Sequence, residues 1–250
     1  MPTNSLKTAL AAGRLTRGVW LTLASPNVAE MAGLAGFDWC LIDGEHGPNT
    51  LTTIQAQLQA LAGTPAQAVV RVPVAEAWII KQVLDLGAQT VMVPMIQSGE
   101  GARDAVAAMR YPPQGIRGMG AALARASGYG GQAEYVARAN DGVALIVQVE
   151  SAAGIADIDA IATTEGVDCI FIGPADLAAD MGHPDDPGHP EVRAAIDHAL
   201  ARIAAAGKPS GIIALAEGEA AHWSARGVAF IGVASDSLLL ASALRRLAKA

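Results

Sequence analysis

Two acidic residues each follow an apolar, strand-like segment, and their type suits a divalent metal ion. Glu150 ends the segment 143–150 (VALIVQVE), and Asp176 lies in the turn 173–176 that follows 168–172 (DCIFI). If these segments are neighbouring parallel strands, both carboxylates lie at the same end of the sheet, where two hard oxygen ligands suit Mg²⁺ or Mn²⁺. The alternative is that Glu150 caps the following helix and Asp176 makes surface hydrogen bonds.

Arg71 lies inside an apolar segment, 68–72 (AVVRV). A guanidinium there is buried only if it meets a carboxylate or an anionic ligand. We expect Arg71 to face an anion or an enolate oxygen, with a structural ion pair to a neighbouring acid as the alternative.

The segment 37–43 ends in an acidic loop that also carries a histidine. His46 follows Asp43 and Glu45, and nearby carboxylates favour the charged imidazole and fix its orientation, as general acid/base chemistry requires. The alternative is an ordinary exposed loop histidine. The turn after 168–172 adds the backbone N–H groups of Gly173 and Ala175, which can grip a small carboxylate at a helix start, whereas Pro174 has no donor.

The remaining histidines and the lysines point to no further chemistry. The spacing of the other histidines is not typical of metal ligands, so we expect loop and helix-surface roles for His183, His189, His198 and His222. None of the four lysines lies at the carboxyl end of a strand-like segment: these are Lys7, Lys81, Lys208 and Lys249. Covalent imine catalysis is therefore disfavoured and metal-based electrophilic catalysis is left. The sequence also contains no GxSxG elbow, P-loop or GxGxxG motif, so no nucleotide cofactor is expected.

The elements that must position these residues alternate between β-branched runs and Ala-rich helical stretches. Eight strands are predicted, at 18–23, 37–43, 68–72, 90–93, 143–150, 168–172, 210–214 and 228–233. Helices are predicted between them, for example at 48–61, 76–86, 99–109, 151–163 and 190–206. Eight such units in 250 residues favour a single α/β domain over 1–250, a (β/α)8 TIM barrel, whose site lies at the carboxyl ends of the strands. Two longer insertions are expected to be functional or mobile loops, at 110–135 and 181–189.

Composition excludes several classes of protein. The net charge of -7 argues against nucleic-acid binding, and no run of about 18 apolar residues suggests a membrane span. Two cysteines provide no disulfide framework, and the first residues lack the apolar stretch of a leader, so we expect a cytoplasmic protein. The last helix, 237–250, is apolar over its first part. It packs either on its own barrel or, as we favour, on a neighbouring subunit.

Several motifs in the same order resemble the HpcH/HpaI aldolase family over nearly the whole chain. They are FDWCLIDGEHGPN, RVP, IIKQVLDLGAQTVMVPMI, YPPQGIRGMG, VQVES and GVDCIFIGPADLAADMG. The resemblance is in particular to metal-dependent 4-hydroxy-2-oxoheptanedioate (2-keto-3-deoxy acid) aldolases. It implies reversible cleavage of 4-hydroxy-2-oxo acids to pyruvate and an aldehyde, a place in the catabolism of aromatic compounds, and a homohexamer.

The resemblance also implies roles for individual residues. Glu150 and Asp176 match the ligands of Mg²⁺, Mn²⁺ or Co²⁺, on which pyruvate is held through its carboxylate and keto oxygens while its enolate forms. Arg71 matches the residue that stabilises the enolate oxygen. His46 matches the acid/base residue, and Asp43 is expected to orient it.

Other positions match the family's outer parts of the site. Asp85, in LDLGA, matches an aspartate that raises the basicity of the histidine and can come from a neighbouring subunit. Pyruvate-binding positions are matched by Gln148 and by Gly173, Pro174, Ala175 and Asp176, and Leu215 lies where the aldehyde pocket is shaped. The HPDDPGHP insertion departs from the family pattern and leaves the aldehyde open.

Two other functions remain to be distinguished. One is a citrate-lyase-like enzyme acting on an acyl thioester, against which the lack of a basic nucleotide-binding patch counts. The other is a non-catalytic barrel that binds a small acid, against which the presence of all the site groups counts.

Overall fold

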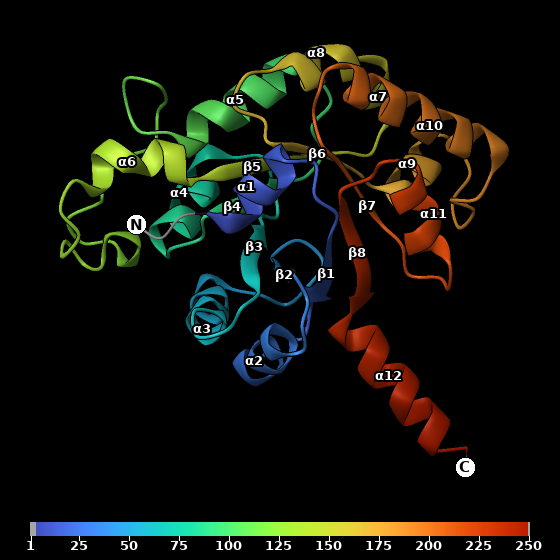
Figure 1. The fold of residues 1–250 in the computed structure, drawn as a ribbon, viewed down its shortest axis with the longest axis horizontal. Coiled ribbons are helices and arrows are strands. Elements are labelled where there is room, and N and C mark those ends of the chain that lie inside the picture. Colours follow the sequence, from blue (N-terminus) through green and yellow to red (C-terminus); the bar gives the residue numbers. More distant parts are fainter. Residues whose placement is uncertain (1–3, 250) are drawn as a thin grey trace.

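The strands of the chain close into a parallel barrel in which each strand pairs with the next in sequence and β8 pairs with β1 (Figure 1). A computed structural model describes residues 4–249. The strands are β1 (Thr16–Leu21), β2 (Trp39–Asp43), β3 (Gln67–Arg71), β4 (Thr90–Val93), β5 (Ala144–Val149), β6 (Cys169–Ile172), β7 (Ser210–Ile213) and β8 (Phe230–Ser235). The predicted (β/α)8 barrel is therefore confirmed, with seven of the eight strands displaced by only one or two residues at an end.

Most helices surround this barrel on the outside, one covers an end of it, and the last points away from it. They are α1 (Ser5–Ala11), α2 (Pro26–Leu34), α3 (Leu51–Leu61), α4 (Ala77–Asp85), α5 (Gly99–Met109), α6 (Tyr135–Gly142), α7 (Ala152–Ala156), α8 (Ile158–Thr163), α9 (Pro174–Asp180), α10 (Pro190–Ala205), α11 (Glu219–Ala225) and α12 (Asp236–Leu247), with a 3₁₀ turn η1 (Arg125–Ser127).

Three predicted segments differ from the observed helices. The stretch 151–163 is two helices, α7 and α8, because the backbone at Asp157 leaves the helical region and its carboxylate instead accepts the N–H of Gly99 at the start of α5. The stretch 48–61 is helical only from Leu51, since Thr50 caps α3. The insertion 110–135 contains η1 and ends where α6 begins at Tyr135.

The barrel interior is filled by aromatic side chains that glycines on neighbouring strands accommodate. Trp39 stacks on Phe230 with ring centroids 3.9 Å apart, and a Cβ at Gly18 would overlap the Trp39 ring. Leu6 and Leu10 of α1 belong to the same buried cluster, so α1 covers one end of the barrel. This is the layered packing expected of a filled core rather than a pore.

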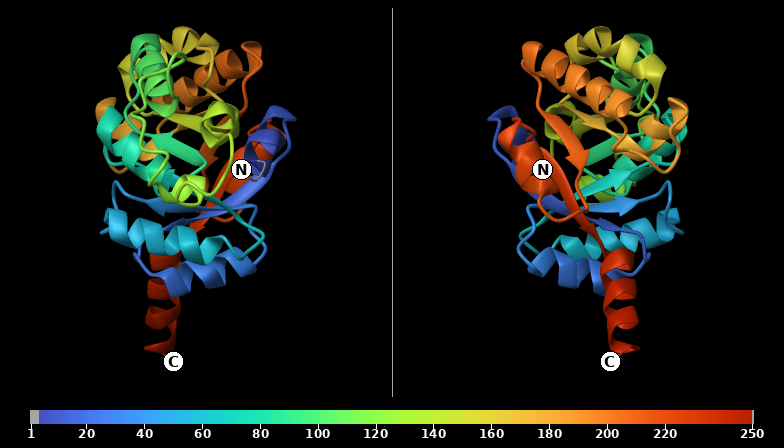
Figure 2. Two further views of the ribbon diagram at one scale, coloured as in Figure 1. Left: turned by 90° about the vertical axis from the view of Figure 1, so that its left-hand side faces the viewer. Right: turned by 90° about the vertical axis from the view of Figure 1, so that its right-hand side faces the viewer.

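The last helix, α12, leaves the barrel and points away from it in every view (Figure 2). Asp236 is its only buried residue among those described, and its carboxylate accepts the N–H groups of Thr22 (2.8 Å) and Leu23 (3.1 Å), which fixes where the helix starts. Five leucines of α12 are exposed: Leu238, Leu239, Leu240, Leu244 and Leu247. The alternative that the helix is buried on its own barrel is wrong, and the expected contact with a neighbouring subunit stays a prediction. Ala250, the end of the predicted helix, lies outside the described residues.

No helix within residues 4–249 combines the length and the apolar character needed to cross a lipid bilayer.

Candidate active site

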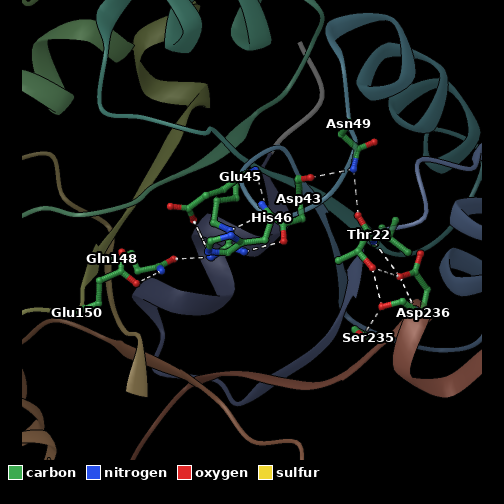
Figure 3. A network of polar contacts seen from close by, with 12 residues as sticks. Thr22, Asp43, Glu45, His46, Asn49, Gln148, Glu150, Ser235 and Asp236 are labelled. Atoms are coloured by element: carbon green, nitrogen blue, oxygen red, sulfur yellow. Dashed lines mark hydrogen bonds and ion pairs between the residues drawn. The ribbon is translucent and has the colours of Figure 1, made fainter. Parts of the chain in front are cut away.

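Polar side chains gather at the carboxyl ends of β2, β3, β5 and β6, on one side of the barrel. Asp43 ends β2 and Arg71 ends β3, whereas Glu150 directly follows β5 and Asp176 lies in the first turn of α9 after β6. Figure 3 shows the side chains of Asp43, Glu45, His46, Gln148 and Glu150 in one polar network. The predicted strand-end residues thus lie on two pairs of neighbouring strands, β2 with β3 and β5 with β6, and the contact of Arg71 with Gln148 joins the two pairs.

The centre of this network is the buried guanidinium of Arg71. It forms a bidentate pair with Asp43, with Nε to Oδ1 at 2.9 Å and Nη2 to Oδ2 at 2.6 Å, and both side chains are nearly inaccessible. Its third nitrogen, Nη1, lies 2.9 Å from Glu45 Oε2 and 3.5 Å from Gln148 Oε1. The alternative of a structural ion pair therefore describes part of what Arg71 does, while Nη1 points toward the metal-ligand candidates.

Asp43 holds the loop that follows β2. Its Oδ1 accepts the backbone N–H groups of Glu45 (3.1 Å) and His46 (3.3 Å), and its own carbonyl accepts the Asn49 amide at 2.9 Å. The His46 ring is 63% exposed, and its Nε2 lies 3.9 Å from Glu45 Oε2. The Asp43 oxygens are taken up by these backbone amides and by Arg71, so Asp43 makes no direct contact with the imidazole, and its expected role in orienting His46 stays a prediction. Asp43 positions the backbone that carries His46.

Glu150 is a buried carboxylate with partners on both oxygens. Oε1 accepts the N–H of Met95 at 2.9 Å, and Oε2 is in close contact with the Gln148 side-chain amide. Burial raises the pKa of Glu150, the hydrogen bonds from Gln148 and Met95 act in the opposite direction, and the charge of Asp176 raises the pKa further. Ser151, not Glu150, caps α7, so the capping alternative for Glu150 is wrong.

Glu150 and Asp176 fit a divalent cation. Both are carboxylates, the ligand type that Mg²⁺ and Mn²⁺ prefer, and they come from adjacent strand ends. The nearest cation, Arg71, is already shared between Asp43 and Glu45, so the charge of Glu150 is poorly compensated in its buried position. Asp176 is exposed, so a small molecule can reach this carboxylate from solvent.

The turn after β6 packs against Glu150 but differs from the prediction. The N–H of Gly173 donates to the carbonyl of Val149 at 3.1 Å, so it is not free to grip a ligand, and this prediction is wrong. Pro174 is the first residue of α9, and the exposed Ala175 is the second. A Cβ at Gly173 would lie 2.5 Å from Glu150 Oε2, which explains why a residue without a side chain occupies this position.

Asp85 and Leu215 lie apart from this network within one chain. Asp85 ends α4, and its Oδ1 pairs with the buried Arg117 at 2.7 Å. Leu215 follows β7 and is half-exposed, lining a cavity of about 260 Å³ between the end of β8 and α12. Within residues 4–249, no hydrogen bond or ion pair joins either residue to the network.

Sequence reasoning placed Glu45 only among the carboxylates beside His46, without its contact to Arg71, and did not identify Met95. Burial is the main cause that raises the pKa of Glu45, and Arg71 lowers it. Glu45 stood in the DGEHG string, but its contact with Arg71 depends on how the loop turns back over the barrel. Met95 has a left-handed φ of 55°, which directs its amide to Glu150, and no sequence signal marks it.

Comparison with known proteins gives consistent likenesses over the whole barrel. Residues 16–243 match the HpcH/HpaI aldolase/citrate lyase family. The chain is 53% identical over 246 residues to a hydroxypyruvate/pyruvate aldolase from Agrobacterium fabrum, covering 98% of this chain and 92% of that protein. It is 49% identical over 245 residues to a 4-hydroxy-2-oxo-heptane-1,7-dioate aldolase from Salmonella dublin, covering 98% and 93%. A crystal structure of a family protein from Burkholderia cenocepacia superposes with a TM-score of 0.96 at 42% identity, covering 99% of this chain and 98% of that one.

Proposed function

This chain belongs to the HpcH/HpaI aldolase/citrate lyase family and, like its named relatives, is a carbon–carbon lyase; we propose that it reversibly cleaves 4-hydroxy-2-oxo acids with a divalent metal ion. The products are pyruvate or hydroxypyruvate and an aldehyde. The observation that carries the proposal is the line of side chains from Arg71 through Gln148 to Glu150, which links a cation to a buried and poorly compensated carboxylate. Both 2-oxo acids are proposed because the name of the Agrobacterium relative includes hydroxypyruvate and pyruvate.

Cleavage breaks the C3–C4 bond, and its electron pair moves through C3 and C2 onto the C2 oxygen. Mg²⁺, Mn²⁺ or Co²⁺ between Glu150 and Asp176 would act as a Lewis acid toward the oxygens of the 2-oxo acid. Arg71 Nη1 is the donor aimed toward this space, and it supplies positive charge where the C2 oxygen becomes negative. Asp43 holds the guanidinium so that this nitrogen keeps its direction. Gln148 and the N–H of Ala175, the second residue of α9, bind the carboxylate of the 2-oxo acid.

His46 accepts the proton of the C4 hydroxyl as the aldehyde carbonyl forms, and the protonated ring or solvent then gives a proton to C3 of the enolate, which completes the released 2-oxo acid. Its ring is exposed at the mouth of the site, where a substrate hydroxyl can reach it, and the loop backbone holding it is fixed by Asp43. In the direction of synthesis the same proton returns to the new C4 hydroxyl. No lysine is needed for this chemistry. Lys208, which precedes β7, donates to the carbonyl of Val167, which precedes β6.

The site is completed by a second copy of the chain. Asp85 contacts Arg117 instead of His46 within its own chain, and the leucines of α12 form an apolar surface that its own barrel leaves uncovered. We propose a homo-oligomer, a hexamer, in which Asp85 of one chain approaches His46 of another and Leu215 shapes the aldehyde pocket. The protein acts in the cytoplasm on small molecules, without nucleic acid, membrane or nucleotide cofactor, in the breakdown of aromatic compounds.

The test is product formation by the chelator-treated protein with metal ions added back. We expect 2-oxo acid release from a panel of 4-hydroxy-2-oxo acids only after Mg²⁺, Mn²⁺ or Co²⁺ is restored, and solvent exchange of pyruvate methyl protons under the same conditions. Borohydride with pyruvate is expected to trap no covalent adduct. Full activity in excess chelator, or covalent trapping, would overturn the proposal, and cleavage of acyl thioesters alone would support the citrate-lyase-like alternative.

A further inference from the structure

The insertion between α9 and α10 brings together three side chains that play no part in the proposed aldolase site. His183, His189 and Glu191 each present one ligand atom, and these atoms all lie within 4.8 Å of one another. They come from the segment that begins after α9 and from the first turn of α10, on the outer side of the barrel (Figure 1).

The loop holds the three side chains in place before any ion binds. His183 Nε2 lies 2.9 Å from Glu191 Oε2, and the His183 and His189 rings are stacked with centroids 3.5 Å apart. Pro190 fixes the start of α10, where His189 is the N-cap, and Arg193 Nε donates to the carbonyl of Gly188 at 3.1 Å. Two histidines on opposite sides of the loop are therefore brought together by its fold and not by their sequence spacing.

We propose that His183, His189 and Glu191 form a second divalent-cation site that takes Zn²⁺ or a similar borderline ion. Two imidazoles and one carboxylate, with water in the fourth position, are a ligand set that Zn²⁺ accepts, whereas the all-carboxylate pair Glu150 and Asp176 suits hard ions. The chain thus has two sites of different ion preference.

The hydrogen bonds of the cluster indicate which atoms bind. His189 Nδ1 accepts the N–H of Glu191 at a long 3.3 Å, so this nitrogen carries a lone pair that a cation can take at little cost. His183 donates through Nε2 to Glu191, and on metal binding this proton moves to Nδ1 or to solvent.

The ligand atoms must still draw closer. Adjacent ligands of a tetrahedral zinc ion lie roughly 3.3 Å apart, as follows from bond lengths of about 2.0–2.2 Å. His183 Nε2 and Glu191 Oε2, 2.9 Å apart, are slightly closer than this separation. The third atom lies within 4.8 Å of both, so side-chain rotation in the exposed loop must move it by about 1.5 Å at most. Binding would join residues 183 and 191 and so restrain the loop that leads from α9, the helix carrying Asp176.

The experiment measures Zn²⁺ and Mg²⁺ binding to the chelator-treated full chain by equilibrium dialysis with metal analysis. We expect His189→Gln and Glu191→Gln each to lower the affinity for one bound Zn²⁺ ion by at least tenfold, while the affinity for Mg²⁺ stays unchanged. His198→Gln, on the exposed side of α10, serves as the control and should bind as the wild type does. Circular dichroism of each metal-free variant checks that the fold is intact.

A second variant separates this site from the proposed catalytic one. The Glu150→Gln protein should still bind the Zn²⁺ ion of the loop site, although it no longer binds Mg²⁺. Co²⁺ bound at the loop site should show the intense visible absorption of tetrahedral coordination. Retention of all Zn²⁺ by the His189→Gln protein, or loss of all Zn²⁺ in Glu150→Gln, would overturn the proposal. Neither result depends on whether the chain is an aldolase.

Discussion

Asp43 and Arg71 occupy paired positions in the β2–β3 ladder, and their side chains form a bidentate ion pair in which both groups are buried. Because the pairing is set by strand register, the direction of the guanidinium follows from the barrel itself. Two of its nitrogens are held by Asp43, so only Nη1 is left to face Glu45, Gln148 and a substrate. An arginine fixed in this way is a pre-organised donor for a developing oxyanion.

Replacing Arg71 by lysine keeps the charge but removes the planar fork that the pair requires. We expect kcat for aldol cleavage to fall by about 10²–10³, the range found when one oxyanion donor is lost. Metal affinity should change little, because Glu150 and Asp176 remain. Arg17→Lys, at an exposed position of β1, is the control. Steady-state kinetics and metal titration of both variants check this, and an unchanged kcat in Arg71→Lys would show that the arginine is only structural.

His46 is expected to act through its ring and not through packing, since the ring is largely exposed. His46→Asn should therefore lower kcat/KM for cleavage by about 10²–10⁴, the usual contribution of general acid/base catalysis, with no loss of thermal stability. The exposed His198 provides the matched control, His198→Asn. If the two variants have the same activity, the proton acceptor is another group.

The pH dependence of stability tests the state of Glu150. Its folded-state pKa is raised above 4.5, mainly by burial, whereas the unfolded chain titrates near the usual value. Between those two values the folded protein without metal holds more protons than the unfolded chain, so its stability is highest below the unfolded pKa and falls as the pH rises. Glu150→Gln cannot ionise and should escape this loss.

Denaturant unfolding in chelator is therefore expected to show Glu150→Gln gaining stability over the wild type as the pH rises from 4.5 toward neutrality. A saturating divalent ion should reverse the order, because only the wild type binds it well, and an excess of 100 times Kd stabilises by about 2.7 kcal/mol. Glu165→Gln, an exposed position after α8, should follow the wild type throughout. A parallel pH profile for Glu150→Gln and wild type in chelator would contradict the argument.

The strands and the strand-end residues could be predicted because each rests on local signals. Apolar β-branched runs mark buried strands, and Asp43, Arg71 and Glu150 are polar residues at the ends of such runs. What sequence does not contain is the path of the loops. The contact of Glu45 with Arg71, and the left-handed backbone that turns the Met95 amide toward Glu150, follow from that path.

The same limit applies to contacts between distant segments. Asp157 interrupts a predicted helix, and its carboxylate accepts the N–H of Gly99 at the start of α5. This contact depends on how the two helices pack, which the local sequence does not contain. His183 and Glu191 are eight positions apart with no ligand motif between them, and a turn of the loop joins them. The proposed approach of Asp85 to a neighbouring subunit likewise depends on surfaces that one sequence does not describe.

The exposed leucines of α12 predict a subunit contact that a charge should weaken. Leu239→Glu with Leu244→Glu places two carboxylates on this surface, and we expect the oligomer to dissociate into smaller species at micromolar concentration. Thr52→Glu, which adds a charge to an exposed position of α3, is the control. Light scattering after gel filtration gives the masses, and an unchanged mass in the double variant would show that α12 does not join subunits.

Gly173 tests how closely the turn after β6 must approach Glu150. A methyl group at this position would lie 2.5 Å from Glu150 Oε2 and 3.0 Å from its Cβ, so Gly173→Ala forces the carboxylate to move. Gln148 and Met95 hold that carboxylate by hydrogen bonds, and the Gln148 amide nitrogen itself lies 3.4 Å from the added methyl, so the movement breaks at least one of these hydrogen bonds. Disturbing groups that orient a metal ligand typically lowers metal affinity by about 10–100-fold, and we expect a loss of this size with a matching loss of kcat/KM at limiting metal.

The matched substitution is Gly63→Ala, where an added Cβ meets no atom within 4 Å and no left-handed backbone is required. The Gly63→Ala protein should bind Mg²⁺ and cleave the substrate as the wild type does. Isothermal titration of metal into the two variants distinguishes the outcomes. Since the alanine adds no charge and removes no ligand, a weakened Mg²⁺ affinity in Gly173→Ala alone would mean that the position of the Glu150 carboxylate determines metal binding. Equal affinities in both variants would place the metal away from Glu150.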